Sequence, residues 1–580
     1  MFKQTFLLFF FMIAMSANSN VIETKYSNFL LPKILSDNDL EIYTNASEYQ
    51  KKHDWEKANR ELSKVENNIL VGHFIYEQLM HPNKYKSSYE ELSNWFRTYE
   101  DYPPVLRKRV YNLLIKRIPD REKKKLYQRP LFDNYLRGYG EDNYGKKTRS
   151  VAKNIDKVGI KNKIELFIDK GDNEKVIEII NKYKHNDYIL FLLNKKISKI
   201  FFKGDIIKSK NLYDFYIKEL NIQNPNFLFR AGINSYRLKD FEKAKTYFDK
   251  CNYFIKNANR WLYSGCHYWG SLLVKSRKNK NSLLEKAASY PRTLYGQLAI
   301  EKLKIADPFV WESKLFKSNP NFSSLNQNKT FRRAIALQEM RFYNYADLEI
   351  RNLYSKINKE KLDSLFYASE KLDLPAVLMR LGSKYYKKDI TLYMRGLYPT
   401  PDWDINNGYQ LDKALLFALI RRESAFNLKA KSEKGARGLM QIMPRTASKL
   451  ENNYRLRYSE AHKLYSLQLN LEIGQKFLKK LMRNSESGNS ILDVLISYNA
   501  GIKRLKNWKK YIVENDPIVF IESIPIKETR WFVKYILTDL WIYRDRMEQE
   551  KPSRTLLANG KWPIYENLDY KLIQDAKFKK

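Results

Sequence analysis

The stretch Glu423–Pro444, ESAFNLKAKSEKGARGLMQIMP, joins the end of an apolar run to a glycine-bearing turn and a short hydrophobic segment. The preceding residues are apolar at positions 411, 414, 415, 418 and 419, which is helical spacing. Glu423 follows Leu419 by four residues and Ile420 by three, so both are its neighbours on the helix surface. Desolvation there raises the pKa of a carboxyl group, as a proton donor near neutral pH requires. Glu423 is therefore a candidate catalytic acid, and the alternative is an ordinary charge at a helix end.

The turn after Glu423 has a long pattern with fixed spacing. Glu-Ser-Ala-Phe-Asn is followed by Ser432, by Gly435-Ala436, and by Gly-Leu-Met-Gln-Ile-Met-Pro at positions 438–444. Glycine allows backbone to approach a ligand or to adopt a left-handed turn. The pattern resembles the catalytic motif of the soluble lytic murein transglycosylases, over about residues 410–540 in detail and more generally before them. The resemblance implies a catalytic domain with a goose-lysozyme-like fold.

The first residues predict export. Lys3 is a charged flank, residues 6–15 are apolar, and small residues follow, with Ala17 and Ser19 at the positions that cleavage after Ser19 requires. This pattern is typical of a secretory signal peptide over residues 1–19, too short for a membrane span. The alternative is an uncleaved anchor. Because no later stretch is apolar for long enough to cross a bilayer, we expect a mature protein without a transmembrane segment, located in the periplasm.

The net charge of +40 comes from 105 Lys and Arg against 65 Asp and Glu in 580 residues. Nucleic acid is the usual partner of such an excess. Export argues against it, and so does the absence of a compact basic cluster with aromatic platforms. We expect a monomer that binds peptidoglycan glycan strands, whose peptide stems carry free carboxylates, and no nucleic acid. The alternative is a lysine-rich composition without a binding role. Cys251 and Cys266 either form a disulfide or are two buried free thiols.

From about residue 22 to 320 the sequence has helical periodicity and few strand signals. The segments 54–58 and 240–244 both look like the start of the second helix in a helix-turn-helix repeat, and spacing from Ala231 to Phe248 is tetratricopeptide-like. This pattern predicts an α-superhelix with a concave binding surface, and irregular helical packing is the alternative. The resemblance implies that these helices form a ring on which the catalytic domain sits.

Two breaks divide the rest of the chain. Residues 317–329 are polar and rich in turn formers, and the two prolines between Tyr398 and Asp402 would end a helix. We therefore predict an α-superhelical ring domain at 20–322, a helical linker domain at 323–397 and a lysozyme-like catalytic domain at 398–580. The predicted fold class is all-α, with an N-terminal α-superhelix of tetratricopeptide-like helix pairs and a C-terminal goose-lysozyme-like domain.

The chemistry that the resemblance implies uses one glutamate twice. In the family, the acid protonates the glycosidic oxygen that leaves C1 of N-acetylmuramic acid. The resulting carboxylate then takes a proton from the sugar's 6-hydroxyl, which attacks C1 and forms a 1,6-anhydro ring without water. The resemblance assigns this role to Glu423. A second catalytic carboxylate is not required, and Glu433 is interpreted as a solvated charge in the turn.

The resemblance also assigns residues that line the saccharide cleft: Ser432, Gln441, Met443, Tyr498, Asn499 and Glu528. A hydroxyl and an amide suit N-acetyl or hydroxyl groups, and a thioether suits a sugar face, although Met443 on spacing alone would more often be core. Ser497 replaces the first alanine of the family's A-Y-N-A-G signature.

The last signature lies between residues 520 and 530, where Glu528 matches a carboxylate that binds substrate. Glu522 and Arg530 are interpreted as structural partners. Phe532 stands where the family usually has tyrosine, so a polar role at that position is in doubt.

The sequence contains neither a metal-ligand pattern among its six histidines nor a phosphate or dinucleotide loop, so we expect no cofactor. The resemblance implies a lytic murein transglycosylase that cleaves the β-1,4 bond between N-acetylmuramic acid and N-acetylglucosamine. One alternative is a goose-type peptidoglycan hydrolase on the same fold. The other is a repeat-based scaffold that binds the cell wall without catalysis.

Overall fold

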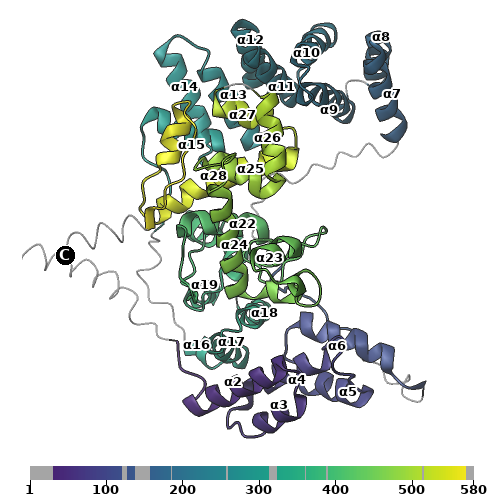
Figure 1. Ribbon diagram of the computed structural model, residues 1–580, viewed down its shortest axis with the longest axis vertical. Coiled ribbons are helices and arrows are strands. Elements are labelled where there is room, and N and C mark those ends of the chain that lie inside the picture. The colour runs from purple at the N-terminus through teal and green to yellow at the C-terminus, as the bar shows by residue number, and fades with distance from the viewer. Residues whose placement is uncertain are drawn as a thin grey trace, which may run out of the picture. The chain divides into compact units, whose positions relative to one another are not determined.

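The computed structural model describes residues 31–120, 127–137, 157–183, 186–255, 259–311, 323–358, 361–386, 389–512 and 515–569. Regular structure in these ranges is helical, with isolated β-bridges only, so the predicted all-α class is confirmed (Figure 1). None of the helices in these ranges combines the length and apolarity needed to cross a bilayer. The signal peptide predicted at residues 1–19 lies outside the described residues.

The chain forms two compact units, each built from two segments of sequence. The first contains residues 1–139 and 314–384, and the second contains residues 140–313 and 385–580. The predicted three-domain division has different limits, at 322 and 397, and stays a prediction.

The first unit combines N-terminal helices with helices of the predicted linker. Its α-helices are α2 (Asp37–Lys51), α3 (Trp55–Leu62), α4 (Val71–Leu79), α5 (Tyr89–Thr98), α6 (Pro104–Arg117), α16 (Ser323–Asn326), α17 (Lys329–Glu339), α18 (Tyr343–Leu353), α19 (Leu362–Lys371) and α20 (Pro375–Gly382).

A buried ion cluster holds the two segments of the first unit together. Arg333 of α17 donates to both carboxylate oxygens of Glu349 on α18, at 2.8 and 2.9 Å. The same carboxylate bonds the ring of His73 on α4, at 2.9 Å. Buried charges are tolerated where they are paired and hydrogen-bonded, as these are. The cluster therefore fixes α17 and α18 against the N-terminal helices.

The second unit begins with helix pairs and ends with the C-terminal helices. The first segment contains α7 (Lys157–Lys170), α8 (Asn173–Lys182), α9 (Asp187–Phe202), α10 (Ile206–Leu220), α11 (Pro225–Arg237), α12 (Phe241–Phe254), α13 (Arg260–Ser271), α14 (Arg277–Ala288) and α15 (Leu294–Leu303). The second contains α21 (Ile390–Leu397), α22 (Lys413–Ser424), α23 (Pro444–Leu450), α24 (Leu467–Met482), α25 (Ile491–Ala500), α26 (Ile502–Tyr511), α27 (Pro517–Ser523), α28 (Lys527–Arg546) and α29 (Pro552–Ala558).

Aspartates start the second helix of two predicted repeats. The side chain of Asp54 caps α3 by accepting from the N–H of Lys57, and Asp240 caps α12 in the same way. Such a cap satisfies a backbone donor that the helix itself leaves unpaired. In the α11–α12 pair, a Cβ atom at Gly232 would lie 2.7 Å from the ring of Phe248, so only glycine permits this close approach. The predicted helix-turn-helix starts are confirmed at both positions.

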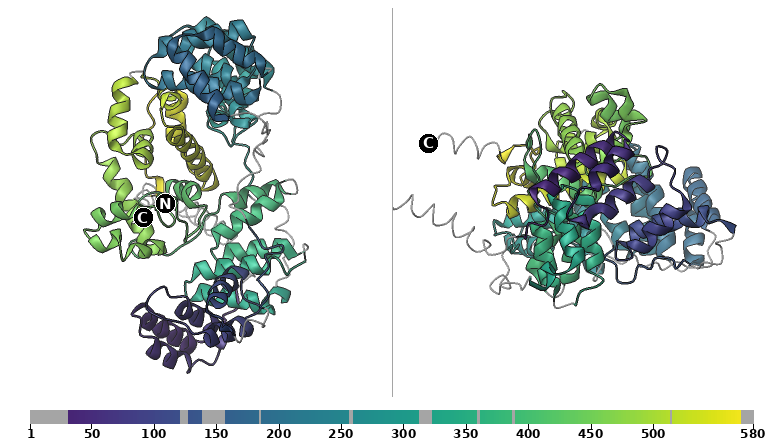
Figure 2. Two further views of the ribbon diagram at one scale, coloured as in Figure 1. Left: turned by 90° about the vertical axis from the view of Figure 1, so that its right-hand side faces the viewer. Right: turned by 90° about the horizontal axis from the view of Figure 1, so that it is seen from below.

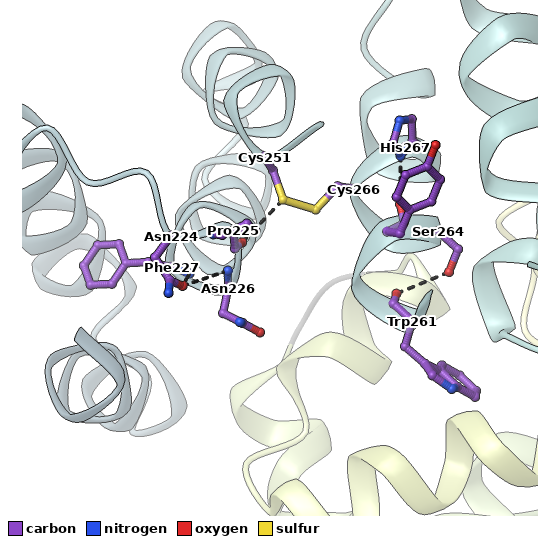
Figure 3. Close-up of a disulfide and its surroundings, with 10 residues drawn as sticks. Asn224, Pro225, Asn226, Phe227, Cys251, Trp261, Ser264, Cys266 and His267 are labelled. Atoms are coloured by element: carbon purple, nitrogen blue, oxygen red, sulfur yellow. Dashed lines mark hydrogen bonds between the residues drawn. A yellow bond between two sulfur atoms is a disulfide. The ribbon is translucent and has the colours of Figure 1, made fainter. Parts of the chain in front are cut away.

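A disulfide joins α12 to α13 (Figure 3). Cys251 and Cys266 have Cα atoms 6.0 Å apart, within the span that a disulfide can bridge. Of the two alternatives that the sequence left open, the structure has the disulfide.

The helix pairs contact the C-terminal helices within the second unit. Helix α15 packs against α28 and α29, and α11 contacts α27 (Figures 1 and 2). Helix α22 packs along α28 and buries every residue from Ala414 to Arg421. The apolar run that the sequence shows before Glu423 therefore belongs to a helix that is buried on all sides from Ala414 to Arg421.

Candidate active site

Glu423 lies in the last turn of α22, as the spacing predicted. The helix ends when Ala425 and Phe426 adopt left-handed backbone angles, φ 48° and 60°. The Glu423 side chain is partly buried. Burial, and then the negative charge of Glu528, raises its pKa to about 8. A carboxyl group with this pKa is mostly protonated at neutral pH and can donate a proton.

The turn after α22 depends on a glycine, Gly438, that has no room for a side chain, and on the side-chain amide of Asn470. Gly438 has φ +76°, and a Cβ atom there would lie 2.3 Å from the carbonyl oxygen of Leu464. The amide of Asn470 on α24 donates to the carbonyl oxygens of Leu464 and Arg437, at 2.7 and 2.9 Å. Its oxygen accepts from the N–H of Met440 at 2.8 Å. Asn470 therefore fixes the turn, and sequence reasoning missed it because no local signal marks it.

Two of the predicted cleft residues take part in the turn itself. Gln441 has a left-handed φ of 49°, and its amide donates to the carbonyl oxygens of Ala430 and Gly438, at 3.2 and 2.8 Å. The Ser432 hydroxyl accepts from the N–H of Ala436 at 3.0 Å. These bonds order both side chains before any substrate is present.

The side chain of Met443 is much more exposed than those of the apolar residues just before it. Met440 and Ile442 are buried, with exposed fractions of 0% and 2%, whereas Met443 is 40% exposed. It stands just before α23, whose first residue is Pro444. The alternative reading of Met443 as a core residue is wrong, and its thioether is accessible to a ligand.

Tyr498 on α25 lies beside both the turn and Glu423. Its hydroxyl donates to the carbonyl oxygen of Met440 at 2.6 Å. Burial, and then the charge of Glu423, raises the pKa of Tyr498 well above its ordinary value. Its ring lies parallel to that of Phe532 on α28, at 6.2 Å and 3°. Phe532 thus packs on Tyr498, a contact that does not need the hydroxyl found in the family.

Asn499 and Glu528 connect α25, α28 and the turn. The hydroxyl of Thr529 donates to the amide oxygen of Asn499 at 2.6 Å. Glu528 is exposed, and its carboxylate lies 4.0 Å from the Nζ atom of Lys434 in the turn. Of the predicted cleft residues, Tyr498 and Glu528 interact electrostatically with Glu423, and Ser432 and Gln441 lie in the turn that follows it.

The part of the chain that contains Glu423 matches a known protein family. Residues 404–520 match the family described as the transglycosylase SLT domain. Residues 404–520 are therefore similar to a transglycosylase SLT domain. The match contains Glu423, the turn and Tyr498, and it confirms the predicted family for this part of the chain.

Relatives extend the likeness beyond the SLT domain. The soluble lytic murein transglycosylase of Escherichia coli K12 is 28% identical over 307 residues, 51% of this chain. That of Salmonella typhimurium is 28% identical over 312 residues, also 51% of this chain. The match spans less than half of the length of these relatives, 45% of each.

A solved structure shares the fold. The crystal structure of the 70 kDa soluble lytic transglycosylase of Escherichia coli covers 91% of this chain and 100% of its own, with a TM-score of 0.57 and 17% identity. The shared fold bears out the predicted class, an α-superhelix with a C-terminal lysozyme-like domain.

Two arginines that precede Glu423 tie α22 to α28. Arg421 and Arg422 both donate to the buried carboxylate of Asp539, at 2.9 and 3.0 Å. Burial alone would raise the pKa of Asp539, but the two arginines hold it below its ordinary value. Glu423 follows Arg422 directly in the sequence. These bonds therefore fix the end of the helix that carries Glu423. Sequence reasoning missed Asp539. Two consecutive arginines at the end of an apolar run are a signal that could have indicated a buried acidic partner.

Glu522, just after the SLT domain, is buried among cations. Its carboxylate accepts from Tyr295 at 2.5 Å, lies 3.1 Å from Arg230, and is paired with Lys534 of α28. Burial opposes ionisation, yet Lys534 and Arg230 lower the pKa of Glu522 to about 2. Arg530 is also buried and donates to the carbonyl oxygen of Ile524. Glu522 and Arg530 are thus both buried and bonded to other groups of the protein, which agrees with their interpretation as structural partners.

Among the residues that the structure describes, no group of three or more His, Cys, Asp and Glu side chains gathers in a way that could hold a metal ion.

Proposed function

We propose that this protein is a lytic murein transglycosylase. It cleaves the β-1,4 bond between N-acetylmuramic acid and N-acetylglucosamine and forms a 1,6-anhydromuramoyl product. The observation that carries the proposal is the raised pKa of Glu423, about 8, inside an SLT domain and beside Tyr498. The names of the relatives, which are soluble lytic murein transglycosylases, support the same activity.

The reaction needs two proton transfers by one group. Neutral Glu423 donates its proton to the glycosidic oxygen as the bond from that oxygen to C1 breaks. The carboxylate that remains accepts the proton of the 6-hydroxyl as its oxygen forms a new bond to C1. Glu423 ends protonated, and no water is consumed. Burial favours the neutral form that the first step needs, and Tyr498, which interacts electrostatically with Glu423, holds the backbone of the turn at Met440.

The other predicted cleft residues bind the sugar. The accessible thioether of Met443 would pack on an apolar sugar face, and the exposed carboxylate of Glu528 would accept from a hydroxyl or amide group. Ser432, Gln441 and Asn499 are held in place by their own hydrogen bonds, so they present ordered polar groups. Pre-ordered groups lose little entropy when a substrate binds.

A goose-type hydrolase is the alternative that one observation favours. A hydrolase would use a second carboxylate to hold water or attack C1. The charge of Glu528 reaches Glu423, so Glu528 is the carboxylate that could do this. Water as nucleophile would leave a reducing end in place of the anhydro ring.

Mass spectrometry of the muropeptides released from purified sacculi tests the proposal. The account predicts 1,6-anhydromuramoyl ends from the wild-type protein and none from Glu423→Gln. Reducing ends from the wild type would assign the protein as a hydrolase. If neither product appears, the protein is the non-catalytic scaffold that binds the cell wall.

We infer that the protein works in the periplasm as a monomer, on peptidoglycan strands and without nucleic acid. The disulfide between Cys251 and Cys266 supports an oxidising compartment, since such bonds persist there. The division into a ring at 20–322, a linker at 323–397 and a catalytic domain at 398–580 is part of this proposal. N-terminal sequencing of the exported protein, with residue 20 first, would support the signal peptide.

A further inference from the structure

A cluster of three aromatic side chains joins α13 to α28. The rings of Trp261 and Trp531 lie 5.4 Å apart at 77°, and Trp261 meets Tyr535 at 4.8 Å and 88°. Trp531 and Tyr535 stack at 5.4 Å and 30°. Trp261 points from α13 toward the yellow C-terminal helices in Figure 3. The helix-pair segment therefore contributes one ring to a cluster that is otherwise part of α28.

The cluster continues the active-site face of α28. Positions 528, 531, 532 and 535 are spaced by three and four residues, so they share one side of the helix. Glu528 begins this row beside Glu423, and Phe532 packs on Tyr498. At the other end, the guanidinium of Arg422 lies 4.3 Å from the ring centre of Tyr535. The row thus runs from Glu528, which interacts with Glu423, to Tyr535, which contacts the side chain of Arg422.

The three rings keep access to solvent. Trp261, Trp531 and Tyr535 are each only partly buried, in contrast to the fully buried Trp541 on the same helix. The indole N–H of Trp541 donates to Ser553, whereas within the described ranges neither Trp261 nor Trp531 has a partner for its indole N–H. Indole rings suit surfaces where an apolar face meets water, and they usually find a partner when buried. A ligand with apolar faces and hydroxyl or acetamido groups would satisfy both properties.

We propose that Trp261, Trp531 and Tyr535 form an aromatic platform that binds N-acetylated aminosugars of a β-1,4-linked glycan strand beyond the reacting bond. The proposal rests on the function proposed above, because it assigns the platform to the same strand. Sugars stack their apolar faces on the rings, and the indole N–H groups donate to sugar oxygens. The helix-pair segment thereby acts in substrate binding through Trp261. Stacking also selects long strands, since only these reach from the cleft to the platform.

The test measures binding of two uncharged oligosaccharides to the full chain by calorimetry. Chitotriose can occupy the cleft, whereas chitohexaose can also reach the platform, and Glu423→Gln is present in every sample to keep both intact. Trp261→Ala should weaken chitohexaose binding about tenfold, the usual cost of removing an aromatic anchor. It should leave chitotriose binding and the unfolding temperature nearly unchanged. Trp261→Phe should retain most of the chitohexaose affinity.

A matched control comes from the same segment. Tyr253 on α12 is 75% exposed, and Tyr253→Ala should bind both oligosaccharides as the parent does. The platform is overturned if Trp261→Ala binds chitohexaose normally. It is also overturned if both affinities fall together with the unfolding temperature, since the cluster would then be packing only. Product analysis of the wild type decides the proposed function separately, because chitohexaose binding does not depend on the kind of end that is formed.

Discussion

Glu423 and Glu522 are glutamates withdrawn from water in the same compact unit, yet their pKa values move in opposite directions. The pKa of Glu423 rises to about 8 and that of Glu522 falls to about 2. Loss of water disfavours the charged form of both. Glu423 then meets the negative charge of Glu528, whereas Glu522 meets Lys534 and Arg230. The neighbours therefore decide which carboxyl can give a proton and which serves as a fixed anion.

The two sites also differ in what surrounds them. Glu423 stands in the last turn of a helix and is only partly buried. Glu522 is fully buried and bonds Arg230 of α11 and Tyr295 of α15. The first site is the one proposed to carry out the reaction, and the second joins the helix pairs to the C-terminal helices.

Replacing the proton donor should give the largest effect. Glu423→Gln keeps the shape of the side chain but removes its acidic proton, so turnover on sacculi should fall by ~10²–10⁴ or more. Circular dichroism should show a folded protein. Glu433→Gln, in the exposed part of the same turn, is the matched control and should retain activity. Release of muropeptides at a near-normal rate by folded Glu423→Gln would remove Glu423 from the mechanism.

Replacing the fixed anion should act on stability. Glu522→Gln leaves the buried Lys534 and the partly buried Arg230 without their counter-charge, so the free energy of unfolding should fall by ~3–5 kcal/mol. Urea unfolding measures this change. Glu285 is exposed on α14, and Glu285→Gln should change stability by less than ~0.5 kcal/mol. An unchanged midpoint for Glu522→Gln would mean that the cluster does not hold the two segments together.

The raised pKa of Glu423 should appear as a pH-dependent cost in stability. Below its ordinary pKa of 4.5 the carboxyl group is neutral both folded and unfolded. As pH rises toward about 8, the unfolded chain ionises first, so the folded state loses stability until both forms are charged. A tenfold difference in acidity between the folded and unfolded chains corresponds to ~1.4 kcal/mol of stability. Glu423→Gln should therefore unfold at a higher temperature than the wild type at pH 9, and at the same temperature near pH 4.

Thermal unfolding at several pH values checks this sign. A difference between the two proteins that does not grow from acid to alkaline pH would show that folding leaves the pKa of Glu423 at its ordinary value. The opposite sign, with the variant less stable at pH 9, would mean that the carboxylate has a cationic partner, as Glu522 does.

Removing the neighbouring charge should give the smallest effect. Glu528 raises the pKa of Glu423, so Glu528→Gln should lower it and move the alkaline limb of kcat/KM slightly to lower pH. The pH profile separates this movement from any loss of substrate binding, which would lower the rate at every pH. A limb that stays in place would assign the raised pKa to burial alone.

Local patterns made much of the site predictable. The apolar spacing before Glu423 identified a buried helix, and the fixed spacing from 423 to 444 identified the turn. The position of Met443 was left open by spacing, because whether it is core depends on packing across the turn. Its exposure next to buried Ile442 became clear only in three dimensions.

Long-range partners could not be predicted. Asn470 holds the turn from 30 residues away, and Asp539 bonds Arg422 across 117 residues. Periodicity describes which face of a helix is buried but not what that face meets. The same limit applies to Trp261, whose partners Trp531 and Tyr535 belong to a different segment of the second unit.

The titration of the two glutamates tests the comparison most directly. Carbon-13 NMR of protein labelled at glutamate side-chain carboxyls follows each group, with Glu423 and Glu522 identified by the signals lost in their glutamine variants. We predict a midpoint near pH 8 for Glu423 and no titration of Glu522 above about pH 3. A midpoint for Glu423 near its ordinary 4.5 would contradict its role as the proton donor at neutral pH.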